Sequence, residues 1–220
     1  MALSVDAYSA SGSLSATSIP STVTGINAND VVVVMAQLQS ASGVSDASIS
    51  DTSSLTWTQR THVKPGYDLW TFWARAPSAI ASDVITVSRT LSAANPMVVW
   101  VMSVSGAPAT GSPFDTNAAL PNDVTAGNPS ISTTASNTLA FAIGSCNAGK
   151  SAGTGWTGLN NQSLYSSFAE YQILSSPVSA LAATLSTGTY NGGIGDAIVA
   201  AGAAPPSWIP SKKQKSYLAR

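Results

Sequence analysis

The stretch Val31-Val32-Val33-Val34-Met35-Ala36 decides the fold class, because it follows the turn signal Asn29-Asp30 and is apolar at every position. A short, uninterrupted run of mostly β-branched residues is typical of a buried β-strand. Similar runs, rich in β-branched and aromatic residues and separated by Pro, Gly and Asn, follow at 55–60, 69–75, 84–88 and 97–104. The pattern predicts an all-β, antiparallel β-sandwich, jelly-roll-like or immunoglobulin-like. We expect almost no helix, and strands at 30–38, 68–75, 83–89, 97–105 and 137–144.

The composition supports this fold class. Of the 220 residues, 44% are hydrophobic and 9% are charged, whereas an ordinary soluble domain has about 25% charged residues. The chain has 36 Ser, 21 Thr and a single Glu, so hydroxyl and amide groups must supply its polar surface. Such a surface disfavours helices, because Ser and Thr compete for backbone hydrogen bonds and the charged pairs of helix faces are missing.

The chain resembles itself at an offset of about 100 residues. The matching segments are 29–37 with 137–144, 55–58 with 154–157, 77–88 with 177–186, and 103–107 with 199–203. We therefore predict an internal two-fold repeat, with pseudo-repeats at about 15–107 and 125–204 that pair Trp57 with Trp156. Chance similarity among Ser, Ala and Val is the alternative. Because each half would leave sheet edges to cover, we expect one domain over 1–204, a sandwich of ten to twelve strands in which 106–129 is a crossover.

The order of these motifs resembles that of a known module. The segments that carry the resemblance are Asp51 to Thr58, Asp68-Leu69-Trp70, Ile85-Thr86-Val87, Ser105-Gly106-Ala107 with Phe114-Asp115, Ser136 to Ala140, Gly153 to Trp156, and Glu170-Tyr171. Over residues 15–204 the chain resembles an all-β sandwich module of about 200 residues found in phage structural proteins and bacterial surface proteins. The resemblance implies a shape and brings no catalytic residues with it.

The distribution of charge and the number of cysteines limit which partners the protein is expected to bind and in which cell compartment it is expected to fold. Residues 1–210 contain five basic and ten acidic side chains, whereas the last ten residues contain four basic ones. We therefore expect no nucleic acid as a partner, since the body has no basic stripe. We also expect no membrane, because no run approaches the roughly 18 apolar residues of a spanning helix. A single cysteine, Cys146, and an N-terminus without signal-peptide features predict folding in a cytoplasm.

The sharpest motif is Gly144 to Ser151, which matches the G-x-x-x-x-G-K-[ST] phosphate loop. Nucleotide binding by this motif requires a helix that begins at the Lys-Ser pair, so that its N-terminal amides hold the phosphates. Three glycines in Ala152 to Gly158 disfavour such a helix. We therefore predict a glycine-rich loop between strands, and no cofactor.

The other groups of residues that could carry catalysis or bind a metal match the required patterns poorly. His62 is the only histidine and precedes a Pro-Gly turn, so we expect it to be solvated in a loop and not to belong to a catalytic triad. Asp46 and Asp51 form the densest acidic group; calcium is possible there, but Asp51 followed by Thr-Ser-Ser favours an Asx turn. Glu170, the only glutamate, lies in a strand-like run and suits glycosidase chemistry poorly. We predict no enzyme and no metal site.

Tryptophans suggest an alternative function. Trp57, Trp70, Trp73, Trp100 and Trp156 could form a sugar-stacking platform in a carbohydrate-binding or adhesive cell-surface module. Trp70 and Phe72 should share one strand face and Trp73 the other. We expect most of these side chains to lie in the core.

The last segment, 205–220, is predicted to be an extended C-terminal arm, because three prolines stiffen its first six residues. The interface residues that we predict there are Trp208, Lys212, Lys213, Lys215, Tyr217 and Arg220. An aromatic anchor followed by basic residues suits docking on an acidic surface; a disordered tail is the alternative. We therefore expect a virion structural protein, a capsid decoration (cement) protein or a coat or tail component. It would be assembled in the host cytoplasm, with itself and a capsid or shell protein as partners.

Overall fold

The computed structural model describes seven stretches of the chain, and every regular element in them is a β-strand. These stretches are residues 2–39, 46–64, 67–89, 95–146, 151–159, 167–185 and 190–202. The strands are β1 (Ser4–Ala16), β2 (Ser18–Ile26), β3 (Val31–Leu38), β4 (Ala47–Asp51), β5 (Thr58–Val63), β6 (Asp68–Arg75), β7 (Ile80–Arg89), β8 (Asn95–Ser105), β9 (Asn122–Val124), β10 (Ser130–Ile131), β11 (Thr138–Cys146), β12 (Thr157–Gly158), β13 (Ser167–Leu174), β14 (Leu181–Ala182) and β15 (Tyr190–Val199). The five strands predicted from the sequence are confirmed as β3, β6, β7, β8 and β11.

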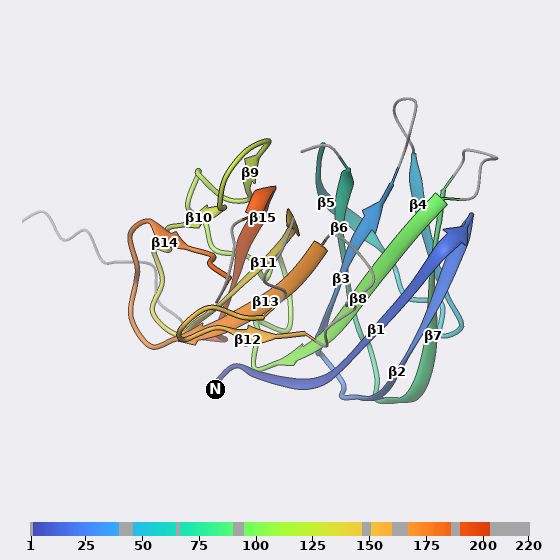
Figure 1. Cartoon of the computed structure of the whole chain (residues 1–220). Helices are drawn as coiled ribbons and strands as arrows, with labels where there is room; N and C mark the ends of the chain where they lie inside the picture. The colour runs from blue at the N-terminus through green and yellow to red at the C-terminus, as the bar shows by residue number, and fades with distance from the viewer. Residues whose placement is uncertain are drawn as a thin grey trace, which may run out of the picture.

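The strands form four antiparallel sheets. β1 to β8 supply a five-stranded sheet of order β1-β8-β3-β6-β5 and a three-stranded sheet of order β2-β7-β4. β9 to β15 supply a five-stranded sheet of order β12-β13-β11-β15-β9 and the pair β10-β14. We call these two sets of strands the first half and the second half. Figure 1 shows them side by side, the first in blue to green and the second in yellow to red.

The apolar run at 31–36 is explained by burial of both faces of β3. Val31, Val33 and Met35 point into a core between the two five-stranded sheets, which we call the central core. Val32 and Val34 point the other way, into a first outer core against β2-β7-β4. Because successive side chains of a strand alternate between faces, an apolar residue is needed at every position.

The second half is built in the same way. Leu139, Phe141 and Ile143 of β11 enter the central core. Ala140 and Ala142 face a second outer core beneath the pair β10-β14. The molecule therefore has four layers and three cores. The expectation of a single sandwich of ten to twelve strands is wrong in this respect: each half is sandwich-like, and fifteen strands lie in the described part.

The second half repeats the strand order of the first. Replacing β1, β2, β3, β5, β6, β7 and β8 by β9, β10, β11, β12, β13, β14 and β15 converts the first pair of sheets into the second, and only β4 lacks a named counterpart. At that place Ala152 makes an isolated antiparallel bridge to Leu185. Trp57 and Trp156 directly precede the corresponding strands β5 and β12, as the predicted repeat requires.

The two halves meet along matching sheet edges. β5, at one edge of the first five-stranded sheet, contacts β9 and β15 at an edge of the second. Towards the opposite edges, Leu3, just before β1, and Leu159, just after β12, belong to the same central core. The halves therefore share a hydrophobic core, with polar contacts along one edge.

The connection between the halves is bonded to the second half. Phe114 forms a bridge to Ile198 of β15, and the N–H of Asp115 donates to the Ala197 carbonyl over 2.9 Å. The Asp115 carboxylate accepts hydrogen bonds from Asn117, Thr134 and Ala135. Burial raises the pKa of this carboxyl, but the hydrogen bonds outweigh burial and hold the pKa below its ordinary value. The segment is thus a fixed crossover rather than a free linker.

Because both faces of β3 are buried, we predict that Val33→Thr and Val34→Thr destabilise the protein equally, each by about 1–3 kcal/mol, since each buries a hydroxyl. The controls lie on β2, where only one face is buried. Val23→Thr, on the buried face, should lower the free energy of unfolding by the same amount. Thr22→Val, on the exposed face, should change the free energy of unfolding by less than about 0.5 kcal/mol. Urea unfolding measures all four. A tolerated substitution at either Val33 or Val34 would contradict the four-layer arrangement.

Candidate functional site

Several sequence-predicted functional residues lie outside the described residues. These are Trp208, Lys212, Lys213, Lys215, Tyr217 and Arg220 of the predicted arm, residues 147–150 of the phosphate-loop match, and the Pro65-Gly66 turn after His62. The described residues on either side of 147–150 have β pairing. β11 ends at Cys146, and Ala152 makes an isolated antiparallel bridge to Leu185.

Gly153 shows how closely the chain packs beside this bridge. A Cβ atom added to it would lie 2.2 Å from the carbonyl oxygen of Thr184. The glycine is thus needed for a close approach of two backbones, which is a common structural role of glycine.

The five tryptophans in the described part pack into the cores. Trp70, Trp100 and Trp156 are buried, while Trp57 and Trp73 are half-buried. As predicted, Trp70 lies on one face of β6 in the first outer core, and Trp73 lies on the other face against the central core. Most of these tryptophan side chains therefore contribute to the cores, as the sequence predicts.

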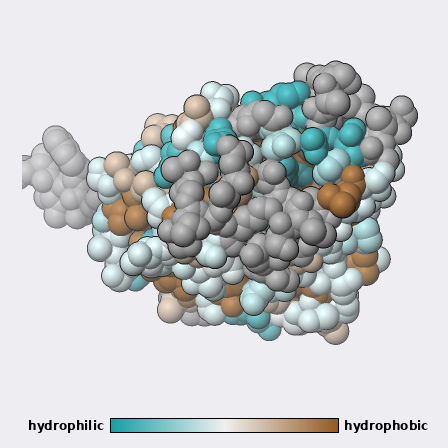
Figure 2. Space-filling model, viewed as in Figure 1, coloured by the Kyte–Doolittle hydropathy of each residue, from teal (hydrophilic) through white to brown (hydrophobic). Residues whose placement is uncertain are grey.

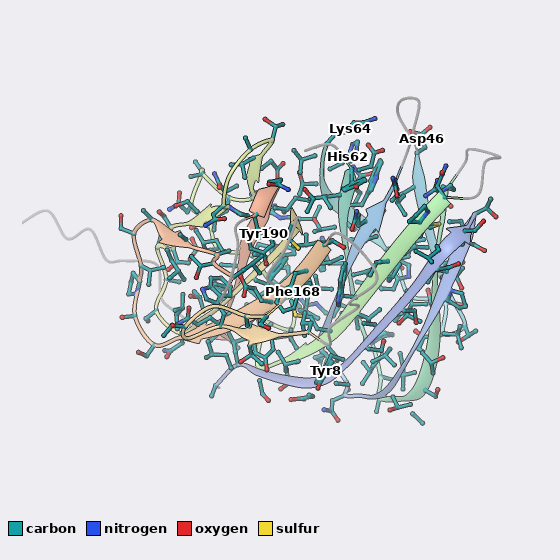
Figure 3. The ribbon with its side chains drawn as sticks, in the orientation of Figure 1. Tyr8, Asp46, His62, Lys64, Phe168 and Tyr190 are labelled. Atoms are coloured by element: carbon teal, nitrogen blue, oxygen red, sulfur yellow. The ribbon has the colours of Figure 1, made fainter. Side chains whose placement is uncertain are left out.

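His62 lies on strand β5 and not in a loop, so that expectation is wrong. Its Nε2 atom is 3.0 Å from Oδ1 of the fully buried Asp68, and its ring stacks on Trp70 with 3.8 Å between centroids. Lys64 Nζ lies 3.8 Å from the other oxygen of Asp68. Figure 3 shows His62 and Lys64 together at the same end of the first half. The arrangement fixes the ends of β5 and β6 to each other.

Acidic side chains elsewhere act as backbone anchors. Asp51, one of the two carboxylates considered for calcium, accepts from the N–H groups of Ser53 and Leu55 and from Trp57 Nε1. The first of these bonds, at 2.8 Å, is the predicted Asx turn. Asp83 accepts from the N–H and hydroxyl of Thr52. Within the described stretches, no three His, Cys, Asp or Glu side chains gather as they would around a metal ion.

The strongest ionic contact joins the two halves. Arg60 of β5 donates through Nε to Oδ2 of Asp196 on β15 over 2.7 Å, and through Nη2 to Oδ1 over 3.3 Å. The guanidinium carbon also lies 4.3 Å from the ring centroid of Phe114 in the crossover. A two-point contact fixes orientation as well as distance, and the aromatic face adds a cation–π attraction.

A second polar contact lies beside the first. The Thr61 hydroxyl donates to the Asp123 carboxylate of β9. Burial raises the pKa of both Asp196 and Asp123, although Arg60 partly opposes this effect on each. We call Arg60, Thr61, Asp123 and Asp196 the inter-half clamp. The sequence analysis missed it, although an aspartate within the otherwise apolar run 194–199 is a signal that could have found Asp196.

A buried acid lies in the second outer core. Glu170 of β13 is fully buried, and its Oε1 accepts a hydrogen bond from the Tyr190 hydroxyl over 3.2 Å. Burial raises the pKa of Glu170 to about 7, an effect that hydrogen bonds only partly oppose. Burial and the neighbouring Glu170 also raise the pKa of Tyr190 well above its ordinary value. Figure 3 shows Tyr190 within the second half, where its ring packs over the backbone of Gly144.

Both side chains of this pair are enclosed by the protein, since neither is more than 1% exposed. When the two halves are matched strand by strand, Glu170 of β13 occupies the position that Phe72, an ordinary core residue, occupies in β6.

Among the described residues, no helix is long and apolar enough to cross a membrane.

Comparison with known protein families, with curated proteins and with solved structures finds no match to this chain. No family is therefore identified, and the resemblance noted from sequence motifs rests on those motifs alone. The structure itself establishes an all-β protein of antiparallel sheets that pack in sandwich-like pairs.

Removing the guanidinium of the inter-half clamp should strongly destabilise the protein. We predict that Arg60→Ala lowers the free energy of unfolding by about 3–5 kcal/mol, because it leaves Asp196 buried without a cation. Adding Asp196→Asn to this variant should recover part of the loss. Arg75→Ala is the control, since Arg75 donates only to the Asn29 and Gly111 carbonyls. Equal losses for Arg60→Ala and Arg75→Ala in urea unfolding would contradict this role.

The buried Glu170 should make stability depend on pH. Its pKa is higher in the folded state, about 7, than its ordinary value of 4.5, so the folded state binds more protons between these limits. The stability that neutral Glu170 contributes is therefore complete below pH 4.5 and is lost as the pH rises through about 7. We predict that Glu170→Gln stabilises the protein above pH 7 by up to about 3 kcal/mol. The matched control is Asp46→Asn at an exposed carboxylate, and unfolding at pH 4.5 and pH 8 measures the difference.

Proposed function

We propose that the chain is a non-enzymatic structural component of a virus particle. It would be a capsid decoration (cement) protein or a coat or tail component that forms a homo-oligomer and docks through its C-terminal arm. One observation supports a structural role above all: nine of the ten acidic side chains accept hydrogen bonds from other described residues of the chain. The nine are Asp6, Asp30, Asp51, Asp68, Asp83, Asp115, Asp123, Glu170 and Asp196. Catalytic acids must instead face a substrate.

We infer that each half is a variant of the jelly roll. The order β1-β8-β3-β6 opposite β2-β7-β4 is what results when an eight-stranded antiparallel ribbon folds over into two sheets, with β5 added to the first sheet. Capsid proteins and lectins both use this architecture. A chain with two such halves has two similar outer faces. This arrangement suits a protein that assembles with other copies better than a protein that binds a ligand in a single pocket.

The surface supports the same proposal. Figure 2 shows a face made mostly of pale residues of intermediate hydropathy, with small and scattered hydrophobic patches. The exposed positions of β1 and β2 are mainly Ser, Thr and Gly. A surface with few charges leaves the basic residues at 212–220 as the largest local charge of the chain.

The alternative, a carbohydrate-binding or adhesive module, would need aromatic side chains on the surface. Tyr8, with 55% of its surface exposed, is the one aromatic residue among the exposed large hydrophobics of the described part. The tryptophans that motivated this alternative lie in the cores. No specific contact favours the alternative over assembly.

Deletion of residues 205–220 tests the proposal. The described contacts lie within residues 2–202, so we predict an unchanged unfolding midpoint but loss of the oligomer in light scattering and of co-sedimentation with shells. Replacing Lys212, Lys213 and Lys215 by Gln should weaken docking only in part and reduce its dependence on salt, because charge attraction is screened whereas apolar burial is not. A truncated chain that assembles like the full chain would refute the docking role. Retention on a polysaccharide column without assembly would favour the alternative.

A further inference from the structure

A cavity of about 340 Å³ opens where β3 begins and β8 ends, at the lower end of these strands in Figure 1. The turn Asn27–Asp30 forms one wall, and the segment from Ser105 to Ala109 forms another. Ala201, which follows β15, completes the lining, and its N–H donates to the Gly106 carbonyl over 2.7 Å. The cavity thus lies where the chain leaves the second half.

The lining combines small apolar groups with acceptor oxygens. The methyl groups of Ala28, Ala107, Ala109 and Ala201 line it together with Asn, Ser and Asp side chains. Apolar walls with a few placed polar atoms are typical of sites that bind small groups, and the polar atoms fix the orientation of the bound group. The volume is sufficient for an indole ring, and the oxygens can accept its N–H.

Two carboxylates give this end of the molecule a negative charge. Asp6 accepts from Asn27 Nδ2 over 2.8 Å and from the Ser105 hydroxyl over 3.0 Å, while Asp30 accepts from the Asn27 N–H and the Ser103 hydroxyl. Neither carboxylate forms an ion pair with a described Lys or Arg. Burial raises the pKa of Asp30, and the nearby Asp6 raises it further. A cation that docks here would relieve this repulsion.

One arginine also lies at this rim. Arg75 donates to the carbonyl oxygens of Asn29 and Gly111 and forms no ion pair with either carboxylate. The cavity therefore has alanine methyl groups in its lining and two carboxylates against one guanidinium at its rim. Its complement is an aromatic side chain followed by basic residues.

That complement is present in the chain itself. The described part ends at Gly202, and Trp208 follows six residues later, ahead of Lys212, Lys213 and Lys215. The three prolines at 205, 206 and 210 favour an extended conformation, in which six residues span about 19 Å at ~3.1 Å each. On this expectation from the sequence, Trp208 would reach a neighbouring copy more readily than the cavity that its own chain borders.

We propose that this cavity receives Trp208 from the arm of a neighbouring copy, with the following lysines beside the exposed Asp6. This inference rests on the proposed function and names the docking site of the arm. Because the donor arm and the acceptor cavity are different surfaces, each copy can give and receive at once. The contact is head-to-tail and generates a ring when its rotation closes.

Two single substitutions test the site from its two sides. Ala28→Tyr fills the cavity, and Trp208→Ala removes the anchor; each should weaken self-association roughly thirtyfold or more, as loss of a buried aromatic anchor does. The matched control is Ala118→Tyr, because Ala118 is also an exposed alanine in second position of an Asn-initiated turn, Asn117–Leu120. It should assemble like the parent chain. Circular dichroism and thermal unfolding check that all three variants fold.

Mixing the two defective variants is the decisive experiment. Ala28→Tyr retains a donor arm, and Trp208→Ala retains an open cavity, so the mixture should form a one-to-one dimer that neither variant forms alone. Analytical ultracentrifugation measures it. Absence of that dimer, or normal assembly of Ala28→Tyr, would overturn the cavity assignment. A monomeric parent chain in which Trp208 is shielded from a fluorescence quencher would also overturn it, since the arm would occupy its own cavity.

The two proposals fail in different ways. If the chain lacking residues 205–220 still assembles, the arm has no docking role and the proposed function loses its support. If truncation abolishes assembly but Ala28→Tyr does not, the docking role stands and only the site is wrong.

Discussion

Burial of the inner strands of the two five-stranded sheets on both faces is the constraint on which the rest of the structure depends. The side chains of β3, β6, β8, β11 and β15 alternate between the central core and an outer core, so a charged group on or beside these strands is enclosed by the protein. Its partner must then lie inside the protein, because an unpaired buried charge is costly. Asp196 is paired with Arg60, Glu170 with Tyr190, and Asp30 with Ser103.

The same constraint explains how the protein uses its few charges. Most of the described carboxylates accept hydrogen bonds from backbone N–H groups, hydroxyls or the guanidinium of Arg60. Asp51 and Asp115 fix turns, whereas the inter-half clamp fixes the position of one half against the other. Under the proposed function, the basic residues at 212–220 would supply the charges that contact another molecule.

The strands could be predicted from the sequence because local signals are strong there: β-branched runs such as 31–36 lie between turn residues. The four layers were harder to predict, although an apolar run without alternation already indicates burial on both faces. The inter-half clamp could not be found from spacing, since Arg60 and Asp196 are far apart in the sequence and meet only because two sheet edges do. The correspondence of Glu170 with Phe72 was equally hidden, because the two residues share a position but no chemistry.

The order of the strands along the chain has a consequence for biosynthesis. β1 pairs with β8, so the first half can close only when the ribosome has made residue 105. The second half is complete only after residue 199, which at 5–20 residues per second takes roughly 5 to 20 s more. During that interval the central-core face of the nascent first half, which includes Val33, Trp100 and Met102, has no second half to cover it. The partly synthesised chain is therefore prone to aggregate at this stage. A chaperone that binds the exposed sheet face would protect it until the second half has folded.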